Sequence, residues 1–134
     1  MEKREETLEE IFGEVIHRYT RAQAIEDGVL IDLSAIHPAL CRAHYKHPVA
    51  CTAAVWSLIQ QAIGCPALHN DLEGVIHDIL WMSRKCSIAL NDHEQLFRVI
   101  ITGTGKTRNH RLKIHCGPGD DAEPVLTVMM REED

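Results

Sequence analysis

The stretch QLFRVIITGTGKTRNHRLKIHCGPGDDAEPVLTVMM, residues 95–130, decides the fold class. Three segments in it, 95–102, 110–116 and 124–130, have the alternating or continuously apolar character of β-strands, and a glycine-containing loop follows each of the first two. In the middle segment the apolar side chains fall on one side of the strand: Leu112, Ile114 and Cys116. Three consecutive strands joined by loops predict an antiparallel meander at the C-terminal end.

The N-terminal two-thirds of the chain repeats its apolar residues at helical spacing instead. Helices are predicted over residues 7–18, 21–27, 34–45, 48–63 and 71–90, with a short strand over 29–33. Thr20 and Gln23 form a capping box at the start of the second helix, and Gly28 is suited to end it in the left-handed conformation. The predicted fold is therefore α+β: an antiparallel sheet of three to four strands packed against three to five helices in one domain, residues 1–134.

Composition limits the functional classes. A net charge of -6 over 134 residues argues against a protein that coats nucleic acid, which would be basic. No apolar run approaches the roughly 18–20 residues that span a bilayer, and the charged start MEKREETLEE does not have the apolar core of a signal peptide. We therefore expect a cytoplasmic protein that has no membrane segment, with its five cysteines reduced and mostly buried.

The sequence GTGKT, residues 103–107, resembles the end of a phosphate-binding loop. Ile100 occupies the position of the first glycine of that motif, and a strand rather than a helix follows it. A glycine-rich hairpin loop is the better interpretation. Four cations surround it and form either a solvated tip or a patch for phosphate or an acidic partner: Lys106, Arg108, Arg111 and Lys113.

A second glycine-rich sequence, CGPGDD, lies between the last two predicted strands. Pro118 followed by Gly119 suits the two central positions of a type II turn. Successive backbone amides beside two carboxylates are also suited to a ligand loop. Gly117, Gly119 and Asp120 are therefore candidate ligand-binding residues, and a structural turn is the alternative.

Four potential zinc ligands occur in CRAHYKHPVAC: Cys41, His44, His47 and Cys51. Structural zinc sites usually join two separated ligand pairs, whereas Pro48 interrupts this segment and Cys51 falls in the next predicted element. We expect no metal here and no cofactor.

Polar residues also concentrate around the second helix and the first strand: Tyr19, Arg21, Asp27 and Asp32. Asp32 could cap the following helix or contact Arg21, so these residues form either a local structural network or a ligand site. Asp78 and Trp81, on the long helix, are further candidates. Asp78 is predicted to lie on an exposed edge or to be a buried anchor.

Three segments carry a resemblance to a known family: IFGEVIHRYTRAQAIEDGVLIDLS (11–34), DILWM (78–82) and CGPGDDAEPVLTVM (116–129). Together they resemble a family of small proteins of unknown function that are carried on plasmids, integrative elements and phages. The matching positions include all nine candidate ligand-binding residues above. The cysteine and histidine cluster and GTGKT lie outside the shared pattern, which weighs against a zinc or nucleotide function for them.

Two functions follow as hypotheses. The first is a non-catalytic accessory protein of a mobile element that binds another protein, a host or element factor. The alternative is a small enzyme or sequestering protein for a phosphorylated or nucleotide-like anion. Convergence of the motif residues on one pocket would favour a ligand site, whereas dispersal would favour a binding module. Nucleic acid is not expected as a partner, and an exposed sheet edge suggests a homodimer.

Overall fold

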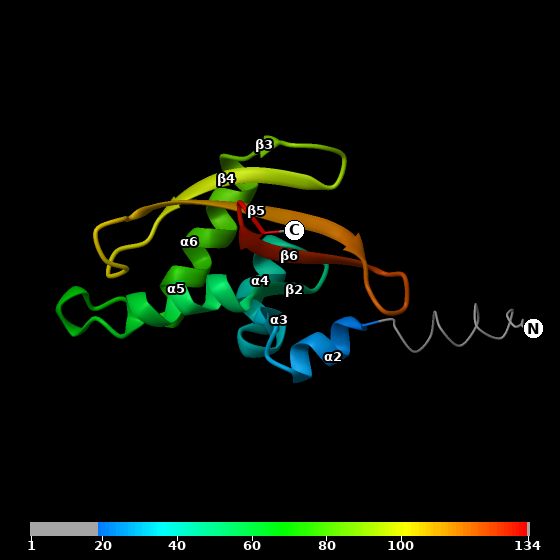
Figure 1. The fold of residues 1–134 in the computed structure, drawn as a ribbon, viewed down its shortest axis with the longest axis horizontal. Coiled ribbons are helices and arrows are strands. Elements are labelled where there is room, and N and C mark those ends of the chain that lie inside the picture. Colours follow the sequence, from blue (N-terminus) through cyan, green and yellow to red (C-terminus); the bar gives the residue numbers. More distant parts are fainter. Residues whose placement is uncertain (1–18, 134) are drawn as a thin grey trace, which may run out of the picture.

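A computed structural model describes residues 19–133 of the chain (Figure 1). The helix expected over residues 7–18 lies outside this range. The described helices are α2 (Arg21–Glu26), α3 (Leu33–Ile36), α4 (Pro38–His44), α5 (Ala53–Ile63) and α6 (Leu72–Lys85), with a 3₁₀ turn at Pro66–Leu68. The strands are β1 (Leu30–Asp32), β2 (Val49–Thr52), β3 (Ile88–Ala89), β4 (Glu94–Ile100), β5 (Asn109–Pro118) and β6 (Pro124–Met130).

The strands form a six-stranded sheet in the order β1-β2-β6-β5-β4-β3. The predicted meander β4–β5–β6 is present and antiparallel. The α+β class is therefore confirmed, but the sheet is larger than expected and it is mixed. Strand β2 pairs in parallel with β6, which joins the first half of the chain to its last strand.

The prediction of one helix over residues 48–63 is wrong at its start. Residues Val49–Thr52 form β2, and α5 begins only at Ala53. Val49, Ala50 and Cys51 are all buried, because β2 is an internal strand. A strand buried on both faces does not alternate apolar with polar residues. The apolar residues of β2 therefore could not be distinguished from the apolar residues of the helix that follows.

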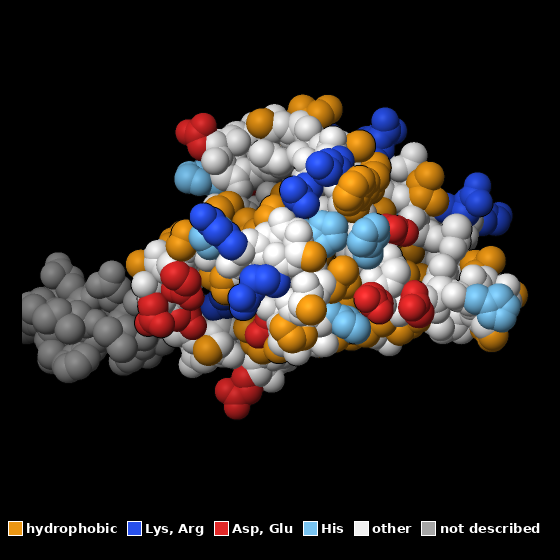
Figure 2. All heavy atoms as spheres, turned by 180° about the vertical axis from the view of Figure 1, so that it is seen from behind, with side chains coloured by type: hydrophobic (Ala, Val, Ile, Leu, Met, Phe, Trp, Pro, Cys, Tyr) orange, Lys and Arg blue, Asp and Glu red, His pale blue; other side chains and the backbone are white. Residues whose placement is uncertain are grey.

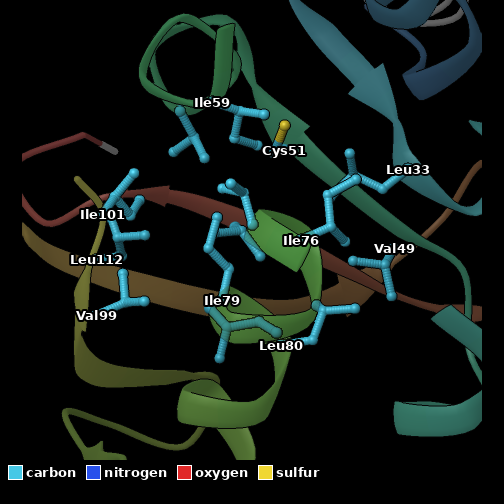
Figure 3. Close-up of a cluster of buried hydrophobic side chains, with 14 of the residues drawn as sticks. Leu33, Val49, Cys51, Ile59, Ile76, Ile79, Leu80, Val99, Ile101 and Leu112 are labelled. Atoms are coloured by element: carbon cyan, nitrogen blue, oxygen red, sulfur yellow. The ribbon is translucent and has the colours of Figure 1, made fainter. Parts of the chain in front are cut away.

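Helices α5 and α6 cover one face of the sheet and form the core with it (Figure 3). Ile59 of α5 and Ile76 and Ile79 of α6 are fully or almost fully buried against Leu112 and Val99 of the sheet. Each such side chain contributes about 1.5–3 kcal/mol through removal of apolar area from water. Within the described residues, no helix has the length and apolar character needed to cross a membrane.

The long helix α6 is shorter than predicted, because it ends at Lys85 rather than near residue 90. Asp71 caps it by accepting a hydrogen bond from the Gly74 N–H, at 3.1 Å. The sequence also offers Asn70 as a cap for this helix, but its side-chain amide instead donates to the Thr102 carbonyl and hydroxyl at 3.1 and 3.0 Å. Asn70 thereby ties the start of α6 to the end of the β4 segment.

The GTGKT segment is a hairpin loop between β4 and β5, as expected. Gly103 and Gly105 have φ values of 86° and 89°, the left-handed region that favours glycine. The Thr104 hydroxyl lies at hydrogen-bonding distance from the Ile101 and Thr107 carbonyls and from His110 Nε2. The glycines and Thr104 therefore have structural roles in the hairpin. These roles account for the GTGKT sequence without a phosphate-binding function.

Candidate functional site

A pocket of about 890 Å³ lies between α2, the start of α5 and the turn that joins β5 to β6. This volume falls within the roughly 300–1,000 Å³ of typical ligand pockets. One side of the pocket is apolar, with Val29, Leu30 and Met129. The polar lining comes from segments far apart in the sequence: Tyr19, Arg21, Thr52, Asp120, Asp121, Thr127 and Glu133.

Helix α2 is held against this pocket by two caps. Thr20 and Gln23 form the predicted capping box. In addition, the Asp120 carboxylate accepts hydrogen bonds from the Arg21 N–H (2.8 Å) and the Ala22 N–H (3.0 Å). A carboxylate at a helix N-terminus satisfies amides that have no partner within the helix. Asp120 therefore connects the β5–β6 turn to α2 across about a hundred residues of sequence.

The Arg21 side chain reaches from α2 to β6. Its guanidinium donates to Thr127 Oγ1 and to the Leu126 carbonyl, both at 2.9 Å. Burial lowers the pKa of this guanidinium, and the charges of Asp32, Asp120 and Glu123 act in the opposite direction. The two ion pairs found among residues 19–133, His77–Asp78 and Lys113–Glu94, do not include Arg21. Arg21 is thus fixed by neutral acceptors.

Tyr19 and Asp27 are joined at the rim of the pocket. The Tyr19 hydroxyl donates to Asp27 Oδ2 at 2.6 Å, and this hydrogen bond raises the pKa of Tyr19. Gly28 follows with a φ of 80°, which turns the chain from α2 into β1. The Tyr19–Asp27 hydrogen bond joins the residues that flank the two ends of α2. It therefore holds the exposed ring of Tyr19 in the wall of the pocket.

Glu133 and Thr52 are polar lining residues that sequence reasoning missed. Glu133 Oε1 accepts from the Thr52 hydroxyl and from the Met130 N–H, both at 2.7 Å. Thr52 is also the N-cap of α5, where it accepts from the Val55 N–H. Threonine is a preferred N-cap residue, so Thr52 had a local signal. No local pattern marks Glu133, because its partner lies 81 residues away.

The β5–β6 turn is not the type II turn expected at Pro118 and Gly119. Pro118 still belongs to β5, and the turn runs from Gly119 to Ala122, with the Ala122 N–H donating to the Gly119 carbonyl. Ala122 has a φ of 66°. The absence of a side chain at Gly119 leaves room for the Glu123 carboxylate, which accepts the Asp121 N–H at 3.0 Å. Asp120 and Asp121 are therefore the central residues of the turn.

The other motif residues do not reach the pocket lining. Asp32 caps α3 by accepting from the Ala35 N–H at 3.2 Å, one of its two predicted roles. Gly117 allows the close approach of the His115 ring, which a side chain at 117 would meet at 2.7 Å. Asp78 and Trp81 lie on α6 instead, where Trp81 stacks on His77 and has Lys85 over its ring.

The four cations near the hairpin do not form one patch. Lys113 is buried in β5 and pairs with Glu94 at 3.5 Å, which corrects its assignment to an exposed surface. The hydrogen bond from Asn91 and the charge of Lys113 both lower the pKa of Glu94. Lys106 and Arg108 are exposed in the loop, and Arg111 is exposed along β5.

The cysteines and the candidate zinc ligands separate in space. Cys41 and Cys51 are in the core, whereas Cys86 and Cys116 are exposed, so the expectation that the cysteines are mostly buried is wrong. His44 packs against His77 and Trp81. Across residues 19–133, no three histidine, cysteine, aspartate or glutamate side chains are grouped as a metal site would need.

The charge of the large pocket is negative. Among residues 19–133, Arg21 is the one cationic residue in its lining, against the carboxylates of Asp120, Asp121 and Glu133. Figure 2 shows acidic side chains gathered at the end of the molecule where the β5–β6 turn lies. Among the described residues, neither the Asp121 carboxylate nor Glu133 Oε2 accepts a hydrogen bond. The two oxygens of Asp121 and Oε2 of Glu133 are thus available to a ligand that carries a donor.

Comparison with known proteins places the chain in a family. Neither a curated protein nor a solved structure shows detectable similarity to it. A family model does match, over residues 9–134, and its description is a family of unknown function, DUF6573. This match includes every residue of the pocket. The chain therefore belongs to the DUF6573 family.

Proposed function

We propose that the protein is a non-catalytic binding protein whose large pocket receives a short, positively charged segment of a partner protein. Tyr19, Arg21, Gly119 and Asp120 converge on this pocket, which indicates a binding site, although other motif residues lie elsewhere. The observation that carries the proposal of a cationic segment is the excess of carboxylates among the described lining residues. Asp120 and Glu133, which could act as acids or bases, already accept backbone amide hydrogen bonds. Fixed carboxylates of this kind support binding more than proton transfer.

The pocket's charge supports a cationic ligand. Two carboxylate groups with open acceptor positions, Asp121 and Glu133, face an apolar wall that includes Leu30 and Met129. A lysine or arginine side chain combines an apolar stem with a terminal donor, so it would bury its stem and keep its charge at the carboxylates. A phosphorylated ligand would instead meet three carboxylates and one guanidinium, which weighs against the anionic alternative at this pocket.

The neighbouring strand supports a peptide in preference to a small amine. Strand β1 is at the end of the sheet and pairs only with β2 among the described strands. Leu30, its first residue, and Val29 directly before it line the pocket. An extended peptide beside β1 would add main-chain hydrogen bonds to the side-chain contacts in the pocket, a common mode of peptide recognition.

Selection of peptides from a displayed random 12-residue library tests this function. We expect enrichment of peptides with a lysine or arginine between apolar residues. A D121N/E133Q double variant should not enrich them, whereas E132Q should, because Glu132 is an exposed neighbour outside the pocket. Recovery of acidic peptides, or of the same basic peptides by the double variant, would refute the assignment.

Two further parts of the proposal concern context. The resemblance supports an accessory protein of a mobile genetic element, acting on a host or element protein. The exposed apolar residues at β3 support a homodimer: Ile88 and Leu90. Genes of family members that consistently lie among conjugation or phage genes would support the first part, and a chromosomal setting without such genes would count against it.

A further inference from the structure

A second, smaller pocket lies at the end of α4, away from the residues that line the large pocket. Its volume is about 110 Å³. Arg42, Lys46 and His47 line it, together with Ser34 and Tyr45, and no carboxylate side chain from the described part of the chain does. This cationic lining stands out in a chain with a net charge of -6.

The walls of this small pocket are fixed by hydrogen bonds to other elements. The Tyr45 hydroxyl lies 2.7 Å from Ser83 Oγ on α6, and Ser34 Oγ accepts from the Val49 N–H at 2.8 Å. The segment between them therefore has both ends anchored, and Pro48 further restricts it. A cavity with anchored walls keeps its shape when it is empty, which lowers the entropic cost of binding.

The cations of the small pocket are not neutralised by neighbours. Neither ion pair found among the described residues includes Arg42, Lys46 or His47. On the face seen in Figure 2, lysine, arginine and histidine side chains gather over the region of α4 and α6. The helix dipole favours a cation in the last turn of a helix, which would account for Arg42. It does not account for Lys46 and His47, which lie beyond His44, the last residue of α4.

We propose that this small pocket binds one tetrahedral oxyanion, the phosphate group of a phosphate monoester. At about 110 Å³ it is smaller than the roughly 300–1,000 Å³ of sites that enclose a whole small-molecule ligand, which suits a single phosphate group. Arg42 supplies a planar pair of donors that matches phosphate oxygens, and Lys46 supplies a point charge. The segment CRAHYKHPVAC, whose composition suggested a zinc site, thus has a structure that supports an anion-binding site.

Titration of the ¹⁵N-labelled protein with inorganic phosphate at constant ionic strength tests the proposal by NMR. We expect saturable shifts confined to amides of residues 34 and 42–47, and no such shifts with chloride. An R42Q/K46Q double variant should weaken phosphate binding at least tenfold, since it removes the charged donors. The control K106Q/R108Q makes the same charge change in the β4–β5 loop and should leave binding unchanged.

Equal loss of binding in the control, shifts scattered over the surface, or no shifts with phosphate would overturn the site. Two further ligands identify the source of the phosphate group: O-phosphoserine, compared with serine, and AMP, compared with adenosine. Tighter binding of O-phosphoserine than of phosphate supports a phosphorylated side chain as ligand, and tighter binding of AMP supports a nucleotide. If neither compound shifts residues 42–47, the phosphate monoester assignment is wrong.

Discussion

Arg21 shows how far residue-level reasoning from sequence can go. Its place at the start of a capped helix was predictable from Thr20 and Gln23. Its partners, Leu126 and Thr127, were not, because they lie more than a hundred residues away and contribute a carbonyl and a hydroxyl that no motif marks. Local signals identify polar residues that have a role, but only the fold shows which of them share a pocket.

Arg21→Lys should lower the free energy of unfolding by about 1 kcal/mol, the usual net value of a hydrogen bond. Lysine cannot reproduce the planar pair of donors that bridges Thr127 and the Leu126 carbonyl. Urea denaturation measures the difference. Arg108→Lys, on the exposed loop, is the control and should have no effect. Equal stability of the two variants would show that the Arg21 contacts contribute nothing.

The thiols should differ in reactivity at pH 8. Burial raises the pKa of Cys51 to about 12 and also raises the pKa of Cys41, so neither forms much thiolate. Cys86 and Cys116 are exposed. Iodoacetamide followed by peptide mass spectrometry should therefore find Cys86 and Cys116 modified in the native protein, and Cys41 and Cys51 only in urea. Early modification of Cys51 would contradict its position in the core.

At the scale of elements, α2 is too short to be stable by itself, with six residues. Its position depends on caps at its start and on the side chains that cross to β6 and the β5–β6 turn. The sequence predicted the helix and the turn separately. It did not predict that Asp120 caps the helix, since nothing in the CGPGDD segment distinguishes Asp120 from Asp121.

Asp120→Asn should therefore destabilise α2 more than Asp121→Asn does. Asparagine keeps one acceptor oxygen but loses the second oxygen and the negative charge near the helix N-terminus, at a cost of about 0.3–1 kcal/mol for the charge. Hydrogen exchange of the Arg21 and Ala22 amides, measured by NMR, should accelerate in the first variant and stay unchanged in the second. The reverse order would mean that Asp121 is the capping residue.

At the scale of the whole molecule, the topology of the sheet explains why only some of its strands could be predicted from the sequence. The meander was predictable because its strands are consecutive and their partners are adjacent in sequence. Strand β2 was not, because Val49 and Thr52 have helical spacing with the apolar residues of α5, and because its parallel partner β6 lies more than seventy residues away. The same parallel pairing brings Thr52 beside Glu133, and so it creates one side of the pocket.

The exposed edge at β3 leads to a prediction about assembly. Ile88 is 70% exposed at the end strand of the sheet, with Leu90 beside it. Edge strands with uncovered apolar residues pair with other chains unless they are blocked. Light scattering after gel filtration should give a dimer mass, and Ile88→Lys should give a monomer. A monomer for the unaltered chain at all concentrations would exclude this interface.

The central claim, that the large pocket binds a cationic segment, is tested most directly by one dissociation constant. Fluorescence anisotropy would measure the affinity of one selected lysine-containing peptide for the unaltered protein, D121N/E133Q and E132Q. We predict at least a tenfold loss for the double variant, about 1.4 kcal/mol, and no change for E132Q. The same affinity for all three proteins, or equally tight binding of a peptide with glutamate in place of lysine, would contradict the claim.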